Sequence, residues 1–198
     1  MGPVITVNSA TLVNKGLELI EAHLLFGLPW DALGVVVHPQ SIVHSMVEFV
    51  DGSTIAQMSP PDMRLPIQLA LGWPQRLPHA FAVMDWSSAA TLEFEPLDRD
   101  AFPAVGLAEE AGRRGGTYPG VLNAANEQAV GAFLARRVQY LDIARVVEQV
   151  MTEHERPVPP GTPVALEDVL DAEAWARARA DELLGRSSSL RGGLATPS

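Results

Sequence analysis

The chain has 198 residues, of which 47% are hydrophobic and 19% are charged, a composition typical of a globular protein with an ordinary core. Its 24 acidic residues outnumber its 14 lysines and arginines, for a formal charge of -10, which argues against nucleic-acid and anionic-membrane partners because both need clustered cations. Cysteine is absent, which excludes disulfides and thiolate metal sites.

The N-terminal residues contain no signal-peptide pattern, and no apolar run in the chain approaches the roughly 20 residues of a membrane span. We therefore expect a cytoplasmic protein.

The N-terminal residues predict a strand followed by a helix. The β-branched run at residues 4–7 predicts the strand. Residues 10–26 predict a helix, for which Ser9 is a suitable N-cap and Gly27 a suitable C-terminal residue.

Three further strands are predicted between residues 34 and 58. Residues 34–38 read as a short buried strand, and residues 44–50 and 53–58 flank Asp51-Gly52. That dipeptide favours a hairpin turn. The first 58 residues therefore predict a β-α-β-β-β unit, with its helix packed on a small sheet.

The rest of the chain predicts a linker and then helices. Residues 59–103 are rich in proline, which disfavours regular structure beyond one short helix near residues 67–72. From residue 104 onward, apolar residues recur every three or four positions, which predicts four helices in a small bundle. These helices are expected at residues 105–114, 122–137 (with Asn123 as a cap), 141–154 and 166–184.

The fold class predicted from these elements is α+β. We expect part of an α/β domain at residues 1–72, followed by a proline-rich linker at residues 73–103. A four-helix bundle-like domain follows at residues 104–184. The Ser/Gly-rich tail at residues 185–198 is expected to be disordered.

The densest group of polar side chains lies around the start of the first predicted helix, at Asn8, Ser9, Asn14, Lys15 and Glu18. Spacings of three and four place Asn14, Lys15 and Glu18 on one helical face. A hydroxyl, an amide, an ammonium and the free amides of a helix N-terminus suit a phosphate or polyhydroxylated ligand. The Glu18 carboxylate suits Mg²⁺ or Mn²⁺ rather than zinc.

A purely structural role is the alternative for these residues. Ser9 would then only cap the helix, and Lys15 with Glu18 would form only a solvated ion pair worth about 0.3 kcal/mol. His38 and His44 lie at strand ends, where structural hydrogen bonding is the more common role. No G-x-G-x-x-G pattern follows a strand, so the chain carries no dinucleotide-binding motif of the usual kind.

Four segments resemble the motifs of the 1-deoxy-D-xylulose 5-phosphate reductoisomerase family. They are residues 6–18 (TVNSATLVNKGLE), 38–41 (HPQS), 61–66 (PDMRLP) and 122–127 (LNAANE), in the order in which the family has them. The resemblance runs from the first residue to about residue 184. It is to the C-terminal part of the family, a portion of the catalytic and dimerisation domain followed by a helical domain.

The resemblance implies an activity and a substrate site. The family converts 1-deoxy-D-xylulose 5-phosphate to 2-C-methyl-D-erythritol 4-phosphate in non-mevalonate isoprenoid biosynthesis, with NADPH and Mn²⁺, Mg²⁺ or Co²⁺. The resemblance implies that Ser9, Asn14 and Lys15 contact the substrate, chiefly at its phosphate. It also implies that Glu18 binds the substrate and the metal, and that Glu18 and Lys15 are the catalytic residues.

The resemblance also implies residues near the cofactor. Gly2 and Met1 would lie in a loop that closes over NADPH, and Met63 would pack near the nicotinamide. The family's N-terminal NADPH-binding domain and its acidic Asp-Ser-Glu motif have no counterpart here. We therefore expect a truncated chain that is inactive alone, and a homodimer as in the family. The alternative is a non-catalytic dimerisation or interaction module.

Overall fold

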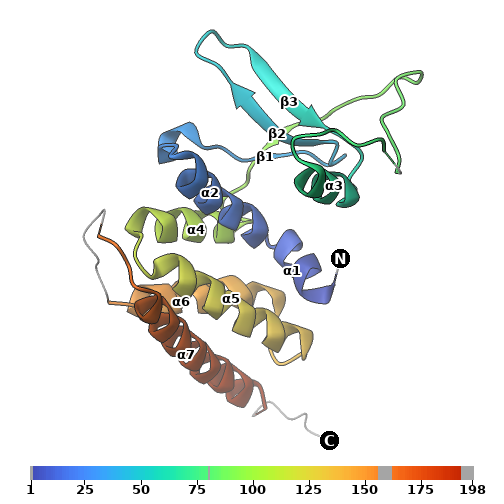
Figure 1. The fold of residues 1–198 in the computed structure, drawn as a ribbon. Helices are drawn as coiled ribbons and strands as arrows, with labels where there is room; N and C mark the ends of the chain where they lie inside the picture. The colour runs from blue at the N-terminus through green and yellow to red at the C-terminus, as the bar shows by residue number, and fades with distance from the viewer. Residues whose placement is uncertain (1, 80, 156–161, 193–198) are drawn as a thin grey trace, which may run out of the picture. The chain divides into compact units, whose positions relative to one another are not determined.

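The computed structural model describes residues 2–79, 81–155 and 162–192, with the backbone alone from residue 186. Helices and two small sheets make up an α+β fold (Figure 1), which confirms the predicted class. The chain divides into two compact units. We call Met1–Gly34 with Asp98–Ser198 the helical unit, and Val35–Leu97 the strand unit. None of the helices in the described residues is both long and apolar enough to cross a membrane.

The chain begins with a helix, so the strand predicted at residues 4–7 is wrong. Helix α1 spans Pro3–Ala10. Pro3 occupies a first-turn position, where its missing N–H has no partner to lose and its fixed φ suits a helix. Val7 is buried in the core of the helical unit. Tertiary packing therefore overrides the β propensity of the run Val4–Val7, which is a weak and context-dependent preference.

In the described residues the helical unit contains α1, five longer helices and the short 3-10 helix Trp30–Ala32. Helix α2 spans Val13–Phe26 and ends at Gly27, whose φ of 65° is the predicted left-handed end. The four helices of the predicted bundle are confirmed: α4 (Pro103–Arg114), α5 (Tyr118–Leu134), α6 (Tyr140–Glu153) and α7 (Leu166–Gly192). Helix α5 contacts α1, α4, α6 and α7, so it is the central helix.

Three details of the helical prediction are wrong. Asn123 does not cap α5, because the helix begins at Tyr118 and Asn123 donates from within it to Glu127. The helix predicted to start at residue 10 begins at Val13. Helix α7 continues to Gly192, so residues 185–192 are not a disordered tail. The prediction for residues 193–198 lies outside the described residues.

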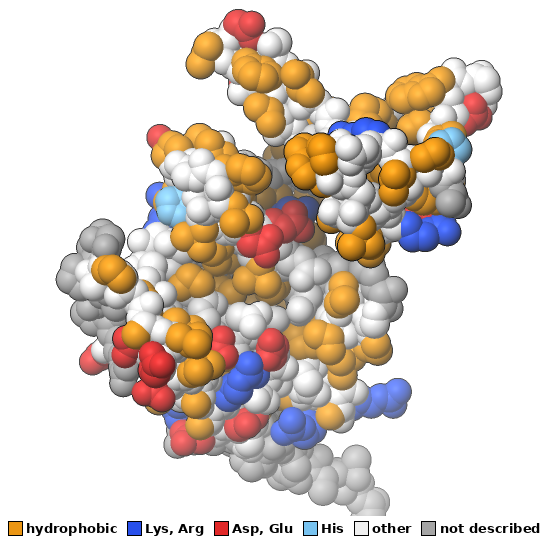
Figure 2. Space-filling model, in the orientation of Figure 1, with side chains coloured by type: hydrophobic (Ala, Val, Ile, Leu, Met, Phe, Trp, Pro, Cys, Tyr) orange, Lys and Arg blue, Asp and Glu red, His pale blue; other side chains and the backbone are white. Residues whose placement is uncertain are grey.

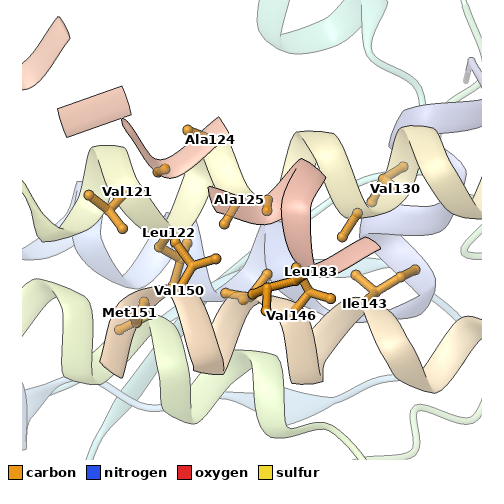
Figure 3. Close-up of a cluster of buried hydrophobic side chains, with 14 of the residues drawn as sticks. Val121, Leu122, Ala124, Ala125, Val130, Ile143, Val146, Val150, Met151 and Leu183 are labelled. Carbon is orange, nitrogen blue, oxygen red and sulfur yellow. The ribbon is translucent and has the colours of Figure 1, made fainter. Parts of the chain in front are cut away.

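The core of the helical unit forms around α5. Figure 3 shows apolar side chains of α5, α6 and α7 gathered in one cluster. Every fourth residue along α7, from Ala172 through Ala176 and Ala180 to Leu184, is buried, as expected for one helical face. Alanine at three of these positions permits close approach of the helices, while Leu122, Ile143 and Val150 fill the larger spaces.

The strand unit has two antiparallel pairs of strands and one helix. Strand β1 (Val36–Val37) pairs with β4 (Glu95–Pro96), and β2 (Val43–Glu48) pairs with β3 (Thr54–Met58) across the predicted Asp51-Gly52 turn. Helix α3 spans Arg64–Gly72. None of the described residues from 35 to 97 is buried, so this unit has no core of its own within the chain.

The compact units divide the chain differently from the predicted boundaries at residues 72 and 104. The first 34 residues belong with the C-terminal helices because α1 packs on α5 and α2 packs on α4. Gly16 makes the second contact close: a Cβ placed there would lie 2.5 Å from Cβ of Ala108. The sequence offers no signal for this pairing, since the two residues lie far apart along the chain.

Gly16→Ala is expected to lower the free energy of unfolding by about 1–3 kcal/mol, because the new methyl group forces α2 away from α4. Urea unfolding followed by circular dichroism measures the change. Gly106→Ala on α4 is the matched control. A Cβ at Gly106 meets nothing within 4 Å, so this substitution should stabilise by about 0.5–1 kcal/mol through helix propensity. Equal midpoints for Gly16→Ala and the unsubstituted chain would contradict the close packing.

Candidate functional site

The candidate site lies at a sharp break between α1 and α2. After Ala10 the side chain of Thr11 is buried, and its hydroxyl donates to the backbone carbonyls of Val7 and Asn8 at 3.1 and 3.3 Å. Leu12 then adopts the left-handed conformation, with φ 59° and ψ 17°. The break brings the last turn of α1 next to the first turn of α2.

Ser9 and Asn14 meet across this break. The Asn14 side-chain amide Nδ2 donates to Ser9 Oγ at 3.3 Å, and both residues are half-buried. The predicted N-cap role of Ser9 is wrong, because Ser9 lies in the last turn of α1 and Leu12 precedes the first residue of α2. Ser9 and Asn14, which the sequence analysis named as substrate contacts, are therefore hydrogen-bonded neighbours.

Lys15 and Glu18 form an ion pair on the next turn of α2. The distance from Lys15 Nζ to Glu18 Oε2 is 2.8 Å, and the two side chains are 40% and 54% exposed. Such a pair is worth about 0–1 kcal/mol. Lys15 is also the only lysine in the sequence. A weak pair of exposed charges is easily opened, so the ammonium and the carboxylate can each turn to a ligand.

These groups together suit an anionic ligand. No side-chain hydrogen bond caps α2, so its first-turn amides keep their capacity to donate, at the positive end of the helix dipole. Ser9 supplies a hydroxyl, Asn14 an amide and Lys15 an ammonium beside those amides. A phosphate group, which accepts several hydrogen bonds and carries negative charge, matches this set of donors.

The described residues supply one carboxylate for a metal at this place. Glu18 is a hard oxygen donor, which fits Mg²⁺ or Mn²⁺. Nowhere in residues 2–79, 81–155 and 162–192 do three or more His, Cys, Asp or Glu side chains converge as a metal site. Hard cations take about six oxygen ligands, so Glu18 fits as one ligand of a site completed by other groups.

The residues predicted to lie near a cofactor fall in different parts of the chain. Gly2 precedes the first residue of α1, about 10 Å of helical rise from Ser9. Met1 lies outside the described residues. Met63 belongs to the strand unit, where it precedes α3 and is 70% exposed.

The segment around Met63 is held by its two neighbours. Asp62 accepts hydrogen bonds from the backbone N–H and the guanidinium of Arg64. These bonds, chiefly the one from the guanidinium, lower the pKa of Asp62 to about 2. The carboxylate is therefore ionised over the physiological range of pH, and it keeps Met63 within a short, ordered turn.

His38 and His44 make structural hydrogen bonds, as the sequence favoured. His38 Nδ1 lies 2.7 Å from the backbone carbonyl of Glu93, and its ring stacks on Phe94. His44 Nε2 lies 3.0 Å from the carbonyl of Ser59. Both contacts link segments of the strand unit.

Two residues that the sequence did not single out reach the α1–α2 break from the bundle. Asn126 on α5 donates from Nδ2 to Asn8 Oδ1 at 3.0 Å, and the Tyr140 hydroxyl on α6 donates to the Ala10 carbonyl at 2.7 Å. Asn126 belongs to one of the four motifs, at residues 122–127, which was the only available signal. Tyr140 had none, because its contact spans 130 residues.

Two stretches of the chain match known protein families. Residues 58–179 match the family described as DXP reductoisomerase C-terminal domain. Residues 1–26, which contain α1, α2 and the break between them, match the 1-deoxy-D-xylulose 5-phosphate reductoisomerase C-terminal domain.

Curated reductoisomerases are similar to this chain over nearly its whole length. The 1-deoxy-D-xylulose 5-phosphate reductoisomerase of Leifsonia xyli subsp. xyli is 62% identical over 94% of this chain, and that of Kitasatospora griseola is 63% identical over 92%. The matched regions are 50% and 47% of those two proteins. The chain thus spans about half the length of the curated relatives it matches.

Solved structures share the fold. The reductoisomerase from Zymomonas mobilis in complex with NADPH aligns with a TM-score of 0.83 at 45% identity, covering 91% of this chain and 47% of that one. A DOX-P reductoisomerase in complex with NADPH, fosmidomycin and magnesium aligns with a TM-score of 0.83 at 39% identity, covering 93% and 47%. This chain therefore belongs to the 1-deoxy-D-xylulose 5-phosphate reductoisomerase family, and it corresponds to the family's C-terminal part.

Proposed function

We propose that the chain supplies the phosphate-binding face and one metal ligand of a 1-deoxy-D-xylulose 5-phosphate reductoisomerase. The reaction is the NADPH-dependent conversion of that substrate to 2-C-methyl-D-erythritol 4-phosphate in isoprenoid biosynthesis. The observation that carries the proposal is the cluster of Ser9, Asn14, Lys15 and Glu18 at the α1–α2 break. This cluster lies within a region that matches the family.

The proposed task of Ser9, Asn14 and Lys15 is to hold the substrate phosphate. Lys15 turns from Glu18 to a phosphate oxygen, while Ser9 Oγ and the Asn14 amide donate to the others. Because the phosphate does not react, this binding energy is available to orient the reacting end of the sugar. The first-turn amides of α2 add to the positive field around the phosphate.

The proposed task of Glu18 is to ligate a divalent metal. When bound, Mg²⁺, Mn²⁺ or Co²⁺ would supply Lewis-acid stabilisation of negative charge on the substrate oxygens. Glu18 contributes one carboxylate oxygen and is freed for this role when Lys15 moves to the phosphate. The two charges of the ion pair are thus divided between the two ends of the site.

The proposed cofactor contacts are Gly2, Met1 and Met63, with Met63 packing against the nicotinamide of NADPH. Two observations support a contact by Met63. Its side chain is exposed, and its backbone is held by the Asp62–Arg64 pair. Related structures have been solved in complex with NADPH. The described residues show no dinucleotide-binding motif, so the rest of the cofactor site is proposed to come from a further domain.

The experiment that tests this function joins the chain to the part of a relative that the chain does not match. A chimaera carries the half of the Kitasatospora griseola enzyme that this chain does not match, followed by the 198 residues. NADPH absorbance is followed with the substrate and Mn²⁺. The chimaera should oxidise NADPH and the 198 residues alone should not, because Glu18 alone gives the metal too few ligands.

The outcomes of this experiment are distinct. A folded chimaera without turnover would contradict the proposed function and favour a non-catalytic dimerisation or interaction module. Turnover by the 198 residues alone would contradict the expected inactivity and require a cofactor site within them.

Substitutions in the chimaera should distinguish the role of Lys15 from that of Glu18. Lys15→Ala is expected to raise KM by about tenfold or more, because a charge-assisted hydrogen bond to phosphate is lost. Glu18→Gln is expected to lower kcat by at least about a hundredfold, because an electrostatic contact at the reacting end is lost. Steady-state kinetics at saturating Mn²⁺ measure both effects.

A second exposed helical ion pair serves as the control for these variants. Glu110 and Arg114 on α4 are 48% and 41% exposed, close to the values for Glu18 and Lys15. Glu110→Gln should leave kcat and KM unchanged. A near-normal kcat for Glu18→Gln would contradict metal binding by Glu18. An unchanged KM for Lys15→Ala would contradict phosphate binding by Lys15.

We also propose a homodimer formed through the strand unit. The β2–β3 hairpin is exposed on both faces, and Figure 2 shows hydrophobic side chains along it. Val47 and Ile55 are cross-strand partners that are 58% and 64% exposed. A two-stranded hairpin without a covered face is marginally stable, and exposed apolar strands favour association.

The chimaera should have twice its monomer mass at micromolar concentration in light scattering. Val47→Lys combined with Ile55→Glu should shift it to monomer, because both charges enter the same face of the hairpin. Thr54→Lys is the control, because Thr54 pairs with Glu48 on the opposite face of the hairpin; this variant should leave the dimer intact. A monomeric mass for the unsubstituted chimaera would contradict a dimer.

A further inference from the structure

The last turn of α1 is attached to the bundle at two points, one on each side of Ser9. Asn126 Nδ2 donates to the side chain of Asn8 at 3.0 Å, and Tyr140 donates to the backbone carbonyl of Ala10 at 2.7 Å. Asn8 and Ala10 are the two sequence neighbours of Ser9. The position of Ser9 is therefore set by α5 and α6 as well as by its own helix.

Asn126 is a poor choice for stability alone. Its side chain is 0% exposed and lines a space whose other walls are mostly apolar, including Leu122, Ile143 and Val147. Its Oδ1 has no hydrogen-bond partner among the described residues. A buried polar atom without a partner destabilises a fold, and an apolar residue of similar size removes that cost. Among the described residues the Asn126 side chain makes one hydrogen bond, to Asn8, and an apolar residue cannot supply it.

Tyr140 is held where it can reach α1. It is the first residue of α6 and lies within a capping box formed by Gln139 before it and Asp142 after it. Its ring packs edge-on against Phe133, with 6.0 Å between ring centroids. Burial raises the pKa of the Tyr140 hydroxyl, so the hydroxyl keeps its proton and remains a donor to Ala10.

We propose that Asn126 and Tyr140 are positioning residues that clamp Ser9 in the orientation needed to contact the substrate phosphate. The inference rests on the proposed function for the role of Ser9, while the clamp itself rests on the two hydrogen bonds. Asn126 restrains the side preceding Ser9 and Tyr140 the side following it. Without them the last turn of α1 keeps the local bonds from Thr11 but should fray more often at its C-terminal end, as helix ends ordinarily do.

Asn126→Leu and Tyr140→Phe test the clamp: the first keeps the number and branching of the side-chain heavy atoms, and the second removes only the hydroxyl. Tyr118→Phe is the matched control, because the Tyr118 hydroxyl also donates to a backbone carbonyl within the bundle, that of His154 at 2.6 Å. Tyr118 lies eight residues before Asn126, about 12 Å along α5. It makes no contact with α1 in the described hydrogen bonds.

Three measurements are made on each variant. Amide hydrogen exchange in the 198 residues without ligand should be about tenfold faster at residues 9–11 in both clamp variants. In the chimaera, KM for the phosphorylated substrate should rise about three- to tenfold, with kcat less affected. The thermal midpoint of Asn126→Leu should be unchanged or higher, since its unpaired oxygen is gone. Tyr118→Phe should lower the thermal midpoint and leave exchange at residues 9–11 and KM unchanged.

The exchange measurement separates this inference from the proposed function, because it needs no ligand. Unchanged exchange at residues 9–11 in both clamp variants would overturn the clamp, whatever the kinetics show. Faster exchange with an unchanged KM would overturn the positioning role. A markedly lower midpoint for Asn126→Leu would show a structural role for Asn126 and would overturn its assignment. An inactive unsubstituted chimaera would instead contradict the proposed function.

Discussion

The left-handed backbone of Leu12 is the constraint on which the candidate site depends. If residues 3–26 formed one continuous helix, Ser9 and Asn14 would lie about 140° apart around its axis. Their side chains could then not meet. The break at Leu12 turns α2 relative to α1, so that the hydroxyl of Ser9 accepts from the amide of Asn14. It also opens the first turn of α2, whose amides would otherwise be bonded within one helix.

Burial on both sides of the break offsets its cost. A left-handed leucine costs about 1–2 kcal/mol. Val7 and Val13, on either side of Leu12, are 8% and 3% exposed, and each buried valine contributes about 1.5–3 kcal/mol. The Thr11 hydroxyl adds hydrogen bonds to the final carbonyls of α1. The strained residue therefore persists because the packing around it exceeds the strain, a pattern common at functional sites.

The sequence was enough to predict those helices and turns that are determined by residues close together along the chain. Helices α4 to α7 follow from apolar spacing, the hairpin from Asp51-Gly52, and the end of α2 from Gly27. The i,i+3 pairing of Lys15 with Glu18 also follows from helix geometry alone. The family was recognised from motifs, and the comparisons confirmed it.

The sequence did not predict the features that are decided by tertiary contacts. Residues 4–7 have β propensity, but Val7 is needed in the helical core. Nothing local marks Leu12 as left-handed, since glycine or asparagine is the usual residue there. The Asn8–Asn126 contact joins residues 118 positions apart. Sequence reasoning therefore found the side chains of the candidate site but not the break and the clamp that bring them together.

Lys15 offers the most direct measurement of the central claim, that the Lys15–Glu18 pair opens when substrate binds. Because Lys15 is the only lysine of the chain, a chimaera ligated from an unlabelled relative half and a ¹³C-lysine-labelled chain has one set of labelled side-chain signals. The account predicts a saturable shift of the Lys15 ε-methylene signal with 1-deoxy-D-xylulose 5-phosphate, and none with unphosphorylated 1-deoxy-D-xylulose. A signal that stays unchanged at saturating substrate, or that shifts equally with both sugars, would contradict it.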